Sequence, residues 1–255
     1  MSKIKIILVT FFGLIIIAVV FFTVYKLQKL NRESQINIPA ISHNQAKSGG
    51  QTDQANSQES TLESGQIAEN LSTNYLLKVP FQSQAPFIDW SEPYENACEE
   101  ASIIMVEHYL NNQDLSKEQM KNEIDRAVDW QIKNWKKHTD LNADQTLKLA
   151  EDYFNLTGQV IRSYSLNDIE KYISSGYPVL VPMDGQLLGN PNFRGVGPEY
   201  HMLVLIGYDD SQEIFITNDP GTRKGEKYIY KYQTVLDAVS GPKKNMEKAV
   251  IVLGK

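Results

Sequence analysis

The sequence contains only one cysteine, Cys98, in 255 residues. No internal disulfide can form, so the fold must rest on its hydrophobic core alone. The net charge is −6 at neutral pH, and basic residues are not clustered in the part expected to fold, which argues against nucleic acid as the main partner. The histidines and acids also lack a recognisable metal-ligand spacing, so neither a metal nor a cofactor is expected.

Charged residues are missing altogether from residues 6–25 near the start of the chain. As a helix, these 20 residues would extend about 30 Å, the thickness of one hydrocarbon core. Lys3 and Lys5 precede the stretch, and no small-x-small cleavage site follows it. We therefore expect residues 1–25 to be an uncleaved transmembrane signal anchor, with the membrane as a partner through this helix.

The orientation of this anchor does not follow from its flanking charges. Lys26, Lys29 and Arg32 on the far side match the basic residues on the near side, so the positive-inside count does not decide. Single-span proteins with a short N-terminal tail usually export their body. We therefore expect a single-pass cell-membrane protein with an extracytoplasmic domain.

Residues 26–74 are rich in Ser, Gln, Asn, Gly and Thr, with isolated apolar residues only. Such a segment cannot bury enough apolar surface to fold alone. As a flexible coil it would hold its ends about 35–42 Å apart. The sequence thus predicts a polar linker at 26–74 and a folded domain at 75–255.

Within the folded domain, helical patterns come first and strand patterns follow. Ser116 with Gln119 forms a capping-box pattern, and Asn142 can cap a further helix. Expected strands, one of them continuously apolar and therefore central, are 160–164, 178–183, 201–208, 213–218, 227–232 and 249–253. Short helices are expected at 165–174 and 234–239, and a long loop at 184–199. This order indicates an α+β fold with an antiparallel sheet.

Cys98 lies where a buried helix should begin. Asn96 can cap that helix, Glu99 and Glu100 fall in its first turn, and residues 101–110 are almost wholly apolar. A lone cysteine is often an inert core residue. At a helix N-terminus, however, the free N–H groups and the dipole favour the thiolate, which is the nucleophilic form.

Two later residues complete a nucleophilic arrangement. His201 opens the central strand, and Asp219 ends the strand expected to pair with it. A cysteine, a histidine and an acid in these places suit the roles of nucleophile, base and orienting group. Gln84 could supply an amide N–H beside that of Cys98 to meet an oxyanion. We expect a Cys98 thiolate paired with a His201 imidazolium at neutral pH.

The blocks VPFQSQ, CEEAS, HMLVLIGYDD and ITNDPG, in this order, resemble the papain-like cysteine peptidases. More closely, they resemble the double-glycine, bacteriocin-processing family and its stand-alone relatives, over residues 77–253. The resemblance implies a papain-like cysteine peptidase fold and a peptide or protein substrate. It also implies Cys98 as nucleophile, His201 as base, Asp219 as third member and Gln84 as oxyanion donor.

Two features depart from this family. Its usual Gly-Pro after the cysteine is replaced by Glu99-Glu100, whose negative charge could raise the pKa of Cys98. The chain also has no transporter or nucleotide-binding domain, so an export role does not carry over. The family cuts after paired glycines, which makes Gly49-Gly50 in the linker a candidate self-cleavage site.

We therefore interpret the chain as a membrane-anchored cysteine peptidase. Two alternatives stay open: a non-catalytic papain-like binding module at the cell surface, and a thiol amidase or acyltransferase acting on cell-envelope peptides. Asn218 competes with Asp219 as the third member, and Gln82 competes with Gln84 as the oxyanion donor, because each pair is close in sequence. His108 should point away from Cys98 on its helix.

Overall fold

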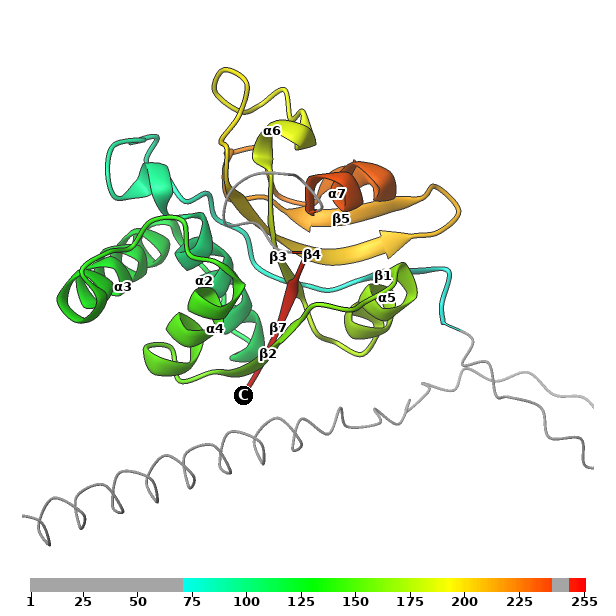
Figure 1. The fold of residues 1–255 in the computed structure, drawn as a ribbon, viewed down its shortest axis with the longest axis horizontal. Coiled ribbons are helices and arrows are strands. Elements are labelled where there is room, and N and C mark those ends of the chain that lie inside the picture. Colours follow the sequence, from blue (N-terminus) through cyan, green and yellow to red (C-terminus); the bar gives the residue numbers. More distant parts are fainter. Residues whose placement is uncertain (1–70, 240–247) are drawn as a thin grey trace, which may run out of the picture. The chain divides into compact units, whose positions relative to one another are not determined.

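The computed structural model describes residues 71–239 and 248–255 (Figure 1). The predicted signal anchor, nearly all of the predicted linker and Gly49-Gly50 lie outside these residues. No helix in the described part of the chain combines the length and the apolar character that a membrane crossing requires.

One antiparallel sheet of seven strands organises the domain. Along the sheet the strands follow the order β2 (Thr157–Ile161), β7 (Val250–Gly254), β3 (Val179–Met183), β4 (His201–Asp209), β5 (Ile214–Asn218) and β6 (Tyr228–Lys231). The short strand β1 (Asn74–Leu76) pairs with the end of β4, beyond the part that pairs with β3. The predicted α+β class with an antiparallel sheet is confirmed.

Strand β4 is the centre of the sheet because its residues are apolar on both faces. Every residue from His201 to Tyr208 is buried, as expected for a strand covered on both sides. Helix α2 (Cys98–Leu110) packs against β4, which brings the start of the helix close to the start of the strand. This packing places Cys98 near His201.

The remaining helices surround this pair of elements. They are α3 (Lys117–Trp135), α4 (Ala143–Asp152), α5 (Leu166–Ser174), α6 (Gly185–Leu188) and α7 (Tyr232–Val239), together with the 3-10 turn η1 (Tyr94–Asn96). In Figure 1, α2, α3 and α4 form one group beside the sheet, and α6 lies near α7.

Local sequence signals explain where several helices begin. The predicted capping box at Ser116 and Gln119 is present at the start of α3, and Asn142 caps α4. The predicted cap at Asn96 is wrong: Ala97 takes the N-cap position of α2 without a side-chain hydrogen bond. Asn96 belongs to η1, where its amide donates to the Glu92 carboxylate instead.

Two boundaries and one element also differ from those expected. The folded part begins before residue 75, because Asn74 is already in β1 and the Ser72 carbonyl accepts a hydrogen bond from the Tyr208 hydroxyl. Strand β2 covers Thr157–Ile161 instead of 160–164. The expected loop at 184–199 contains α6, a helix too short to leave a periodic pattern in the sequence.

Candidate active site

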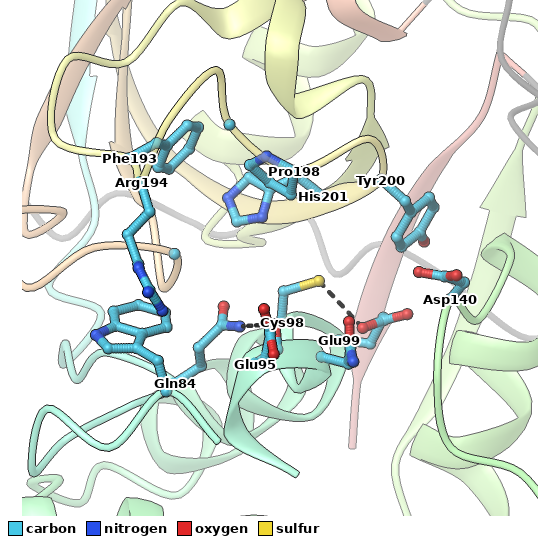
Figure 2. Close-up of a pocket in the computed structure, with 14 residues that line it drawn as sticks. Gln84, Glu95, Cys98, Glu99, Asp140, Phe193, Arg194, Pro198, Tyr200 and His201 are labelled. Carbon is cyan, nitrogen blue, oxygen red and sulfur yellow. Dashed lines mark hydrogen bonds between the residues drawn. The ribbon is translucent and has the colours of Figure 1, made fainter. Parts of the chain in front are cut away.

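Gln84, Cys98 and His201 line one cavity of about 220 Å³ (Figure 2). Three elements bring them together: the segment after β1, the first residue of α2 and the first residue of β4. The Cys98 side chain is only 6% exposed, and that of His201 is also buried. His201 is therefore enclosed at the start of β4.

Asp219 contacts the His201 ring. Strands β4 and β5 form an antiparallel pair, so the residue that follows β5 comes next to the residue that opens β4. His201 Nε2 lies 2.8 Å from Asp219 Oδ1, and both residues are buried. Since Nε2 is occupied by Asp219, Nδ1 is the ring nitrogen left to exchange a proton in the cavity.

Asp219 receives four hydrogen bonds. Besides His201, the Gly221 N–H donates to Oδ1 over 3.0 Å, and the Tyr230 hydroxyl and the Asn190 amide donate to Oδ2 over 2.7 and 3.2 Å. Burial alone would raise the pKa of Asp219, but the charge of His201 and these hydrogen bonds outweigh burial and lower it. Asp219 is therefore ionised and can hold an imidazolium.

Asn190 and Tyr230 were missed by the sequence reasoning. Asn190 follows α6 in the long segment before β4, and Tyr230 lies on β6, so no local motif joins them to Asp219. The only sequence signal was the length of the segment 184–199, which is typical of functional loops.

The His201 ring is also confined from two sides by packing. The Phe193 ring meets the imidazole edge-on, with ring centres 5.2 Å apart. At Gly221 an added Cβ would lie 2.7 Å from His201 Cε1, too close for any side chain. Glycine is required there because the main chain approaches the imidazole closely.

Asn218 points elsewhere, as expected for a neighbour of Asp219 on an alternating strand. Its side-chain amide donates to the carbonyls of Val79 and Pro80, over 3.1 and 3.3 Å, and its oxygen accepts from the Lys227 N–H. Asn218 thus ties the segment after β1 to the sheet, and Asp219 is the one of the two that contacts His201.

Of the two glutamines, only Gln84 lines the cavity, while Gln82 donates to the Leu115 carbonyl over 3.0 Å. The orientation of Gln84 differs from that expected of an oxyanion donor. Its Nε2 donates to the carbonyls of Tyr94 and Glu95, over 2.9 and 3.1 Å, and its buried Oε1 has no partner among the described residues. Both N–H groups of Nε2 are therefore engaged, and at least one of these carbonyls must be released before Gln84 can offer an N–H to a reacting carbonyl.

The Cys98 thiol donates a hydrogen bond to Glu99 Oε2 over 3.1 Å, drawn as a dashed line in Figure 2, and not to His201. Burial raises the pKa of Cys98 well above its usual range, and the charges of Glu99 and Glu100 raise it further. A hydrogen bond from the Met202 main chain opposes them. The expected thiolate is therefore wrong for this state, because desolvation and adjacent carboxylates outweigh the helix N-terminus.

The other described histidines lie outside the cavity. On α2, His108 contacts the Asp114 carbonyl through Nδ1 over 2.8 Å and Glu123 through Nε2 over 3.0 Å. Glu107, His108 and Glu123 place their ligand atoms within 4.8 Å of one another, close enough to share a metal ion. Both ring nitrogens already have protein partners, however, and an ion pair accounts for the group. His138 lies 3.6 Å from Glu92.

No curated protein sequence matches the chain significantly. A crystal structure from Bacillus anthracis, described as a C39-like peptidase, is 20% identical with a TM-score of 0.48, over 71% of this chain and 98% of that one. Xylellain, a cysteine protease from Xylella fastidiosa, is 12% identical with a TM-score of 0.40, over 72% and 87% of the two chains.

The family model described as "Peptidase_C39 like family" matches residues 76–248, which is more than half of the chain. The match includes Gln84, Cys98, His201 and Asp219. The chain therefore belongs to the Peptidase_C39 like family and is a cysteine peptidase.

Proposed function

We propose that the protein hydrolyses peptide bonds with Cys98 as nucleophile, His201 as general base and acid, and Asp219 as the group that orients His201. The observation that carries this proposal is the buried His201–Asp219 pair, 2.8 Å apart, in the wall of the same cavity as Cys98. Nucleophile, base and orienting acid are the minimum set for acyl transfer through a thiol.

Each step of this reaction has a group to perform it. The Cys98 thiol gives its proton to His201 Nδ1, and the sulfur then adds to the substrate carbonyl carbon, which places a negative charge on the carbonyl oxygen. The imidazolium protonates the leaving nitrogen as the C–N bond breaks, leaving a thioester. Water then loses a proton to His201 and attacks the thioester, which releases the acid and restores the thiol.

The ionised Asp219 stabilises the imidazolium in both halves of the reaction. Its hydrogen bond to Nε2 keeps the proton on that nitrogen and leaves Nδ1 facing the substrate. Tyr230 and Asn190 hold the second carboxylate oxygen, so Asp219 cannot turn away from the ring. Asn190 and Tyr230 therefore act through Asp219.

Two donors are available for the oxyanion. Cys98 is the first residue of α2, where main-chain N–H groups lack partners within the helix. Gln84 is the candidate for the second N–H, and its Nε2 would have to exchange a hydrogen bond to the Tyr94 or Glu95 carbonyl for one to the oxyanion.

The membrane location is part of the proposal. The charge-free stretch at 6–25 supports a single-pass anchor, and the polar segment after it is long enough to separate the peptidase domain from the bilayer. The substrate would then be a peptide or protein outside the cytoplasm.

A mixture of unstructured peptides, followed by mass spectrometry, tests the activity without knowledge of the natural substrate. The wild-type protein should generate new peptide ends, and Cys98→Ala and His201→Ala should not. His138→Ala is the matched control, because His138 lies outside the cavity. Equal cleavage by Cys98→Ala would exclude a thiol mechanism. A wild-type protein that binds peptides without cutting them would indicate a binding module.

A further inference from the structure

Glu99 supplies a carboxylate next to the proposed nucleophile, whereas the carboxylate of Asp219 contacts His201. Glu99 is completely buried and follows Cys98 in the first turn of α2. One oxygen accepts the Cys98 thiol hydrogen over 3.1 Å, and the other accepts the Leu141 N–H over 2.6 Å. Since both oxygens are engaged, the carboxylate is fixed in place beside the sulfur.

The surroundings of Glu99 are acidic. Glu100 follows it on α2, Asp140 faces it from the segment between α3 and α4, and Tyr200 faces it from the segment before β4. The Tyr200 hydroxyl donates to the Leu141 carbonyl over 2.5 Å, so these segments are joined around Glu99. Burial raises the pKa of Glu99 to about 7, and Asp140 contributes to the rise.

We infer that Glu99 is a positioning residue that holds the Cys98 thiol protonated and directed away from His201, and that neutralising Glu99 releases the sulfur to His201. This inference rests on the proposed role of Cys98. An ionised Glu99 accepts the thiol hydrogen and repels a thiolate, so it favours the resting thiol in two ways. When Glu99 is neutral, the repulsion is gone and its oxygen is a weaker acceptor, so the proton can pass from the sulfur to His201 Nδ1.

Glu100 shows why contact with the sulfur matters. It is equally buried and adjacent in sequence, and burial likewise raises its pKa. Its Oε1, however, accepts a hydrogen bond from the Gln131 amide, and no hydrogen bond joins it to Cys98. Glu100 is therefore a matched control for a buried carboxylate that does not hold the thiol.

The pH dependence of thiol alkylation tests this inference. Iodoacetamide rates from pH 5 to pH 10 should be measured on the full chain for wild type, Glu99→Gln and Glu100→Gln. Glutamine has the shape of glutamate and can still accept the Leu141 N–H. In Glu99→Gln the apparent pKa of Cys98 should fall by about one unit or more, and alkylation at about pH 9, where Glu99 of the wild type is ionised, should be at least about tenfold faster.

Glu100→Gln should shift the profile by clearly less than Glu99→Gln. Equal profiles for wild type and Glu99→Gln, or an equal shift in both variants, would overturn the inference. A merely structural role of Glu99 would change stability without moving the alkylation pKa.

A surface variant keeps the test valid if Glu99→Gln fails to fold. Asp140 is exposed, and its charge helps to raise the pKa of Glu99. In Asp140→Asn the pKa of Glu99 should fall. The pH at which ionisation of Glu99 begins to slow the alkylation of Cys98 should therefore also fall. An unmoved profile in this variant would also contradict the inference.

Peptide cleavage separates this inference from the proposed function. If the wild type cleaves peptides and the alkylation profile of Glu99→Gln is unchanged, the role inferred for Glu99 is rejected and the proposed peptidase function is kept. A shifted profile without any cleavage by wild type would remove the peptidase proposal and leave Glu99 as the residue that controls the thiol.

Discussion

Three neighbours fix the orientation of the His201 imidazole, the group proposed to transfer protons. Asp219 binds Nε2, Phe193 packs edge-on against the ring, and the Gly221 main chain lies where no Cβ would fit. The ring can therefore change its protonation state without changing its orientation. The Cys98 sulfur differs, because its hydrogen bond goes to Glu99 and must be exchanged for one to His201 before reaction.

Substitution of Asp219 should mainly lower kcat, whereas substitution of Asn218 should mainly lower the free energy of unfolding. Asp219→Ala removes the partner of His201 and should lower kcat by about 10²–10⁴. Asn218→Ala leaves buried main-chain carbonyls without a donor, which should cost about 1–3 kcal/mol of unfolding free energy and leave kcat nearly unchanged. Urea unfolding and peptide cleavage measure the two effects; the reverse ranking in kcat would make Asn218 the orienting residue.

Gln84 should matter mainly in the transition state. Gln84→Ala is expected to lower kcat by about 10²–10³ with little change in KM, since an oxyanion donor acts only once charge develops. Alkylation of Cys98 forms no oxyanion and should proceed normally. Gln82→Ala is the control, because Gln82 is bound to Leu115 outside the cavity. Full turnover by Gln84→Ala would mean that other donors stabilise the oxyanion.

The direction of a side chain could be predicted from the sequence where the alternation of a strand determines it. Asn218 and Asp219 must point to opposite faces, and the resemblance favoured Asp219, which the structure places against His201. The state of Cys98 could not be predicted, because it depends on burial and on the partner that its sulfur selects. The adjacent Glu99-Glu100 was visible as a departure that could raise the thiol pKa, and the structure bears this out.

At the scale of elements, an ion pair fastens α2 to α3. The Glu123 side chain of α3 hydrogen-bonds to His108 of α2 and raises the His108 pKa above its ordinary value of 6.5. A histidine whose pKa is raised by folding stabilises the folded state at low pH, and this stabilisation is lost as the pH rises through the folded pKa. The pair should therefore help to hold α2, and with it Cys98, more strongly in acid.

Glu123→Gln should lower the melting temperature more at pH 6 than at pH 9. A hydrogen bond to a charged group contributes about 1.5–3 kcal/mol, which corresponds to a loss of several degrees at pH 6. Scanning calorimetry at both pH values provides the measurement. Glu118→Gln, an exposed change on the same helix, should show the same small effect at each pH. A pH-independent loss in Glu123→Gln would mean that His108 is not charged.

Elements with a strong local signal were predicted well. Helices α3 and α4 begin at the capping residues marked in the sequence, and β4 is the continuous apolar run. The start of α2 was misjudged at Asn96 because tertiary contacts around the preceding 3-10 turn override the local cap preference. Helix α6 went unnoticed because four residues show no period.

On the scale of the whole molecule, the proposed catalytic residues are far apart in sequence and are brought together by the sheet and by the packing of α2 on it. The pairing of β4 with β5 joins His201 to Asp219, and the packing of α2 on β4 brings in Cys98. The order of the four sequence blocks that resemble the family predicted that these residues come together. The spacing of the residues alone could not have predicted it. Asn190 and Tyr230, from separate segments, escaped because only the folded chain brings them to Asp219.

The proposed anchor predicts where the domain should be found. Protease added to intact cells or spheroplasts should digest the peptidase domain, because the polar segment would hold it outside the bilayer. Deleting residues 1–25 should move the protein from the membrane fraction to the soluble fraction. Complete protection of the full-length protein from added protease would place the domain in the cytoplasm instead.

Labelling of Cys98 by an epoxide or vinyl-sulfone thiol probe, followed by intact mass spectrometry, tests whether His201 activates Cys98. Because Cys98 is the only cysteine, any thiol adduct reports this residue alone. We predict one adduct per chain in the wild type, labelling at least about 10²-fold slower in His201→Ala, and an unchanged rate in His138→Ala. Equal labelling of wild type and His201→Ala would contradict the account, since Cys98 would then react without His201.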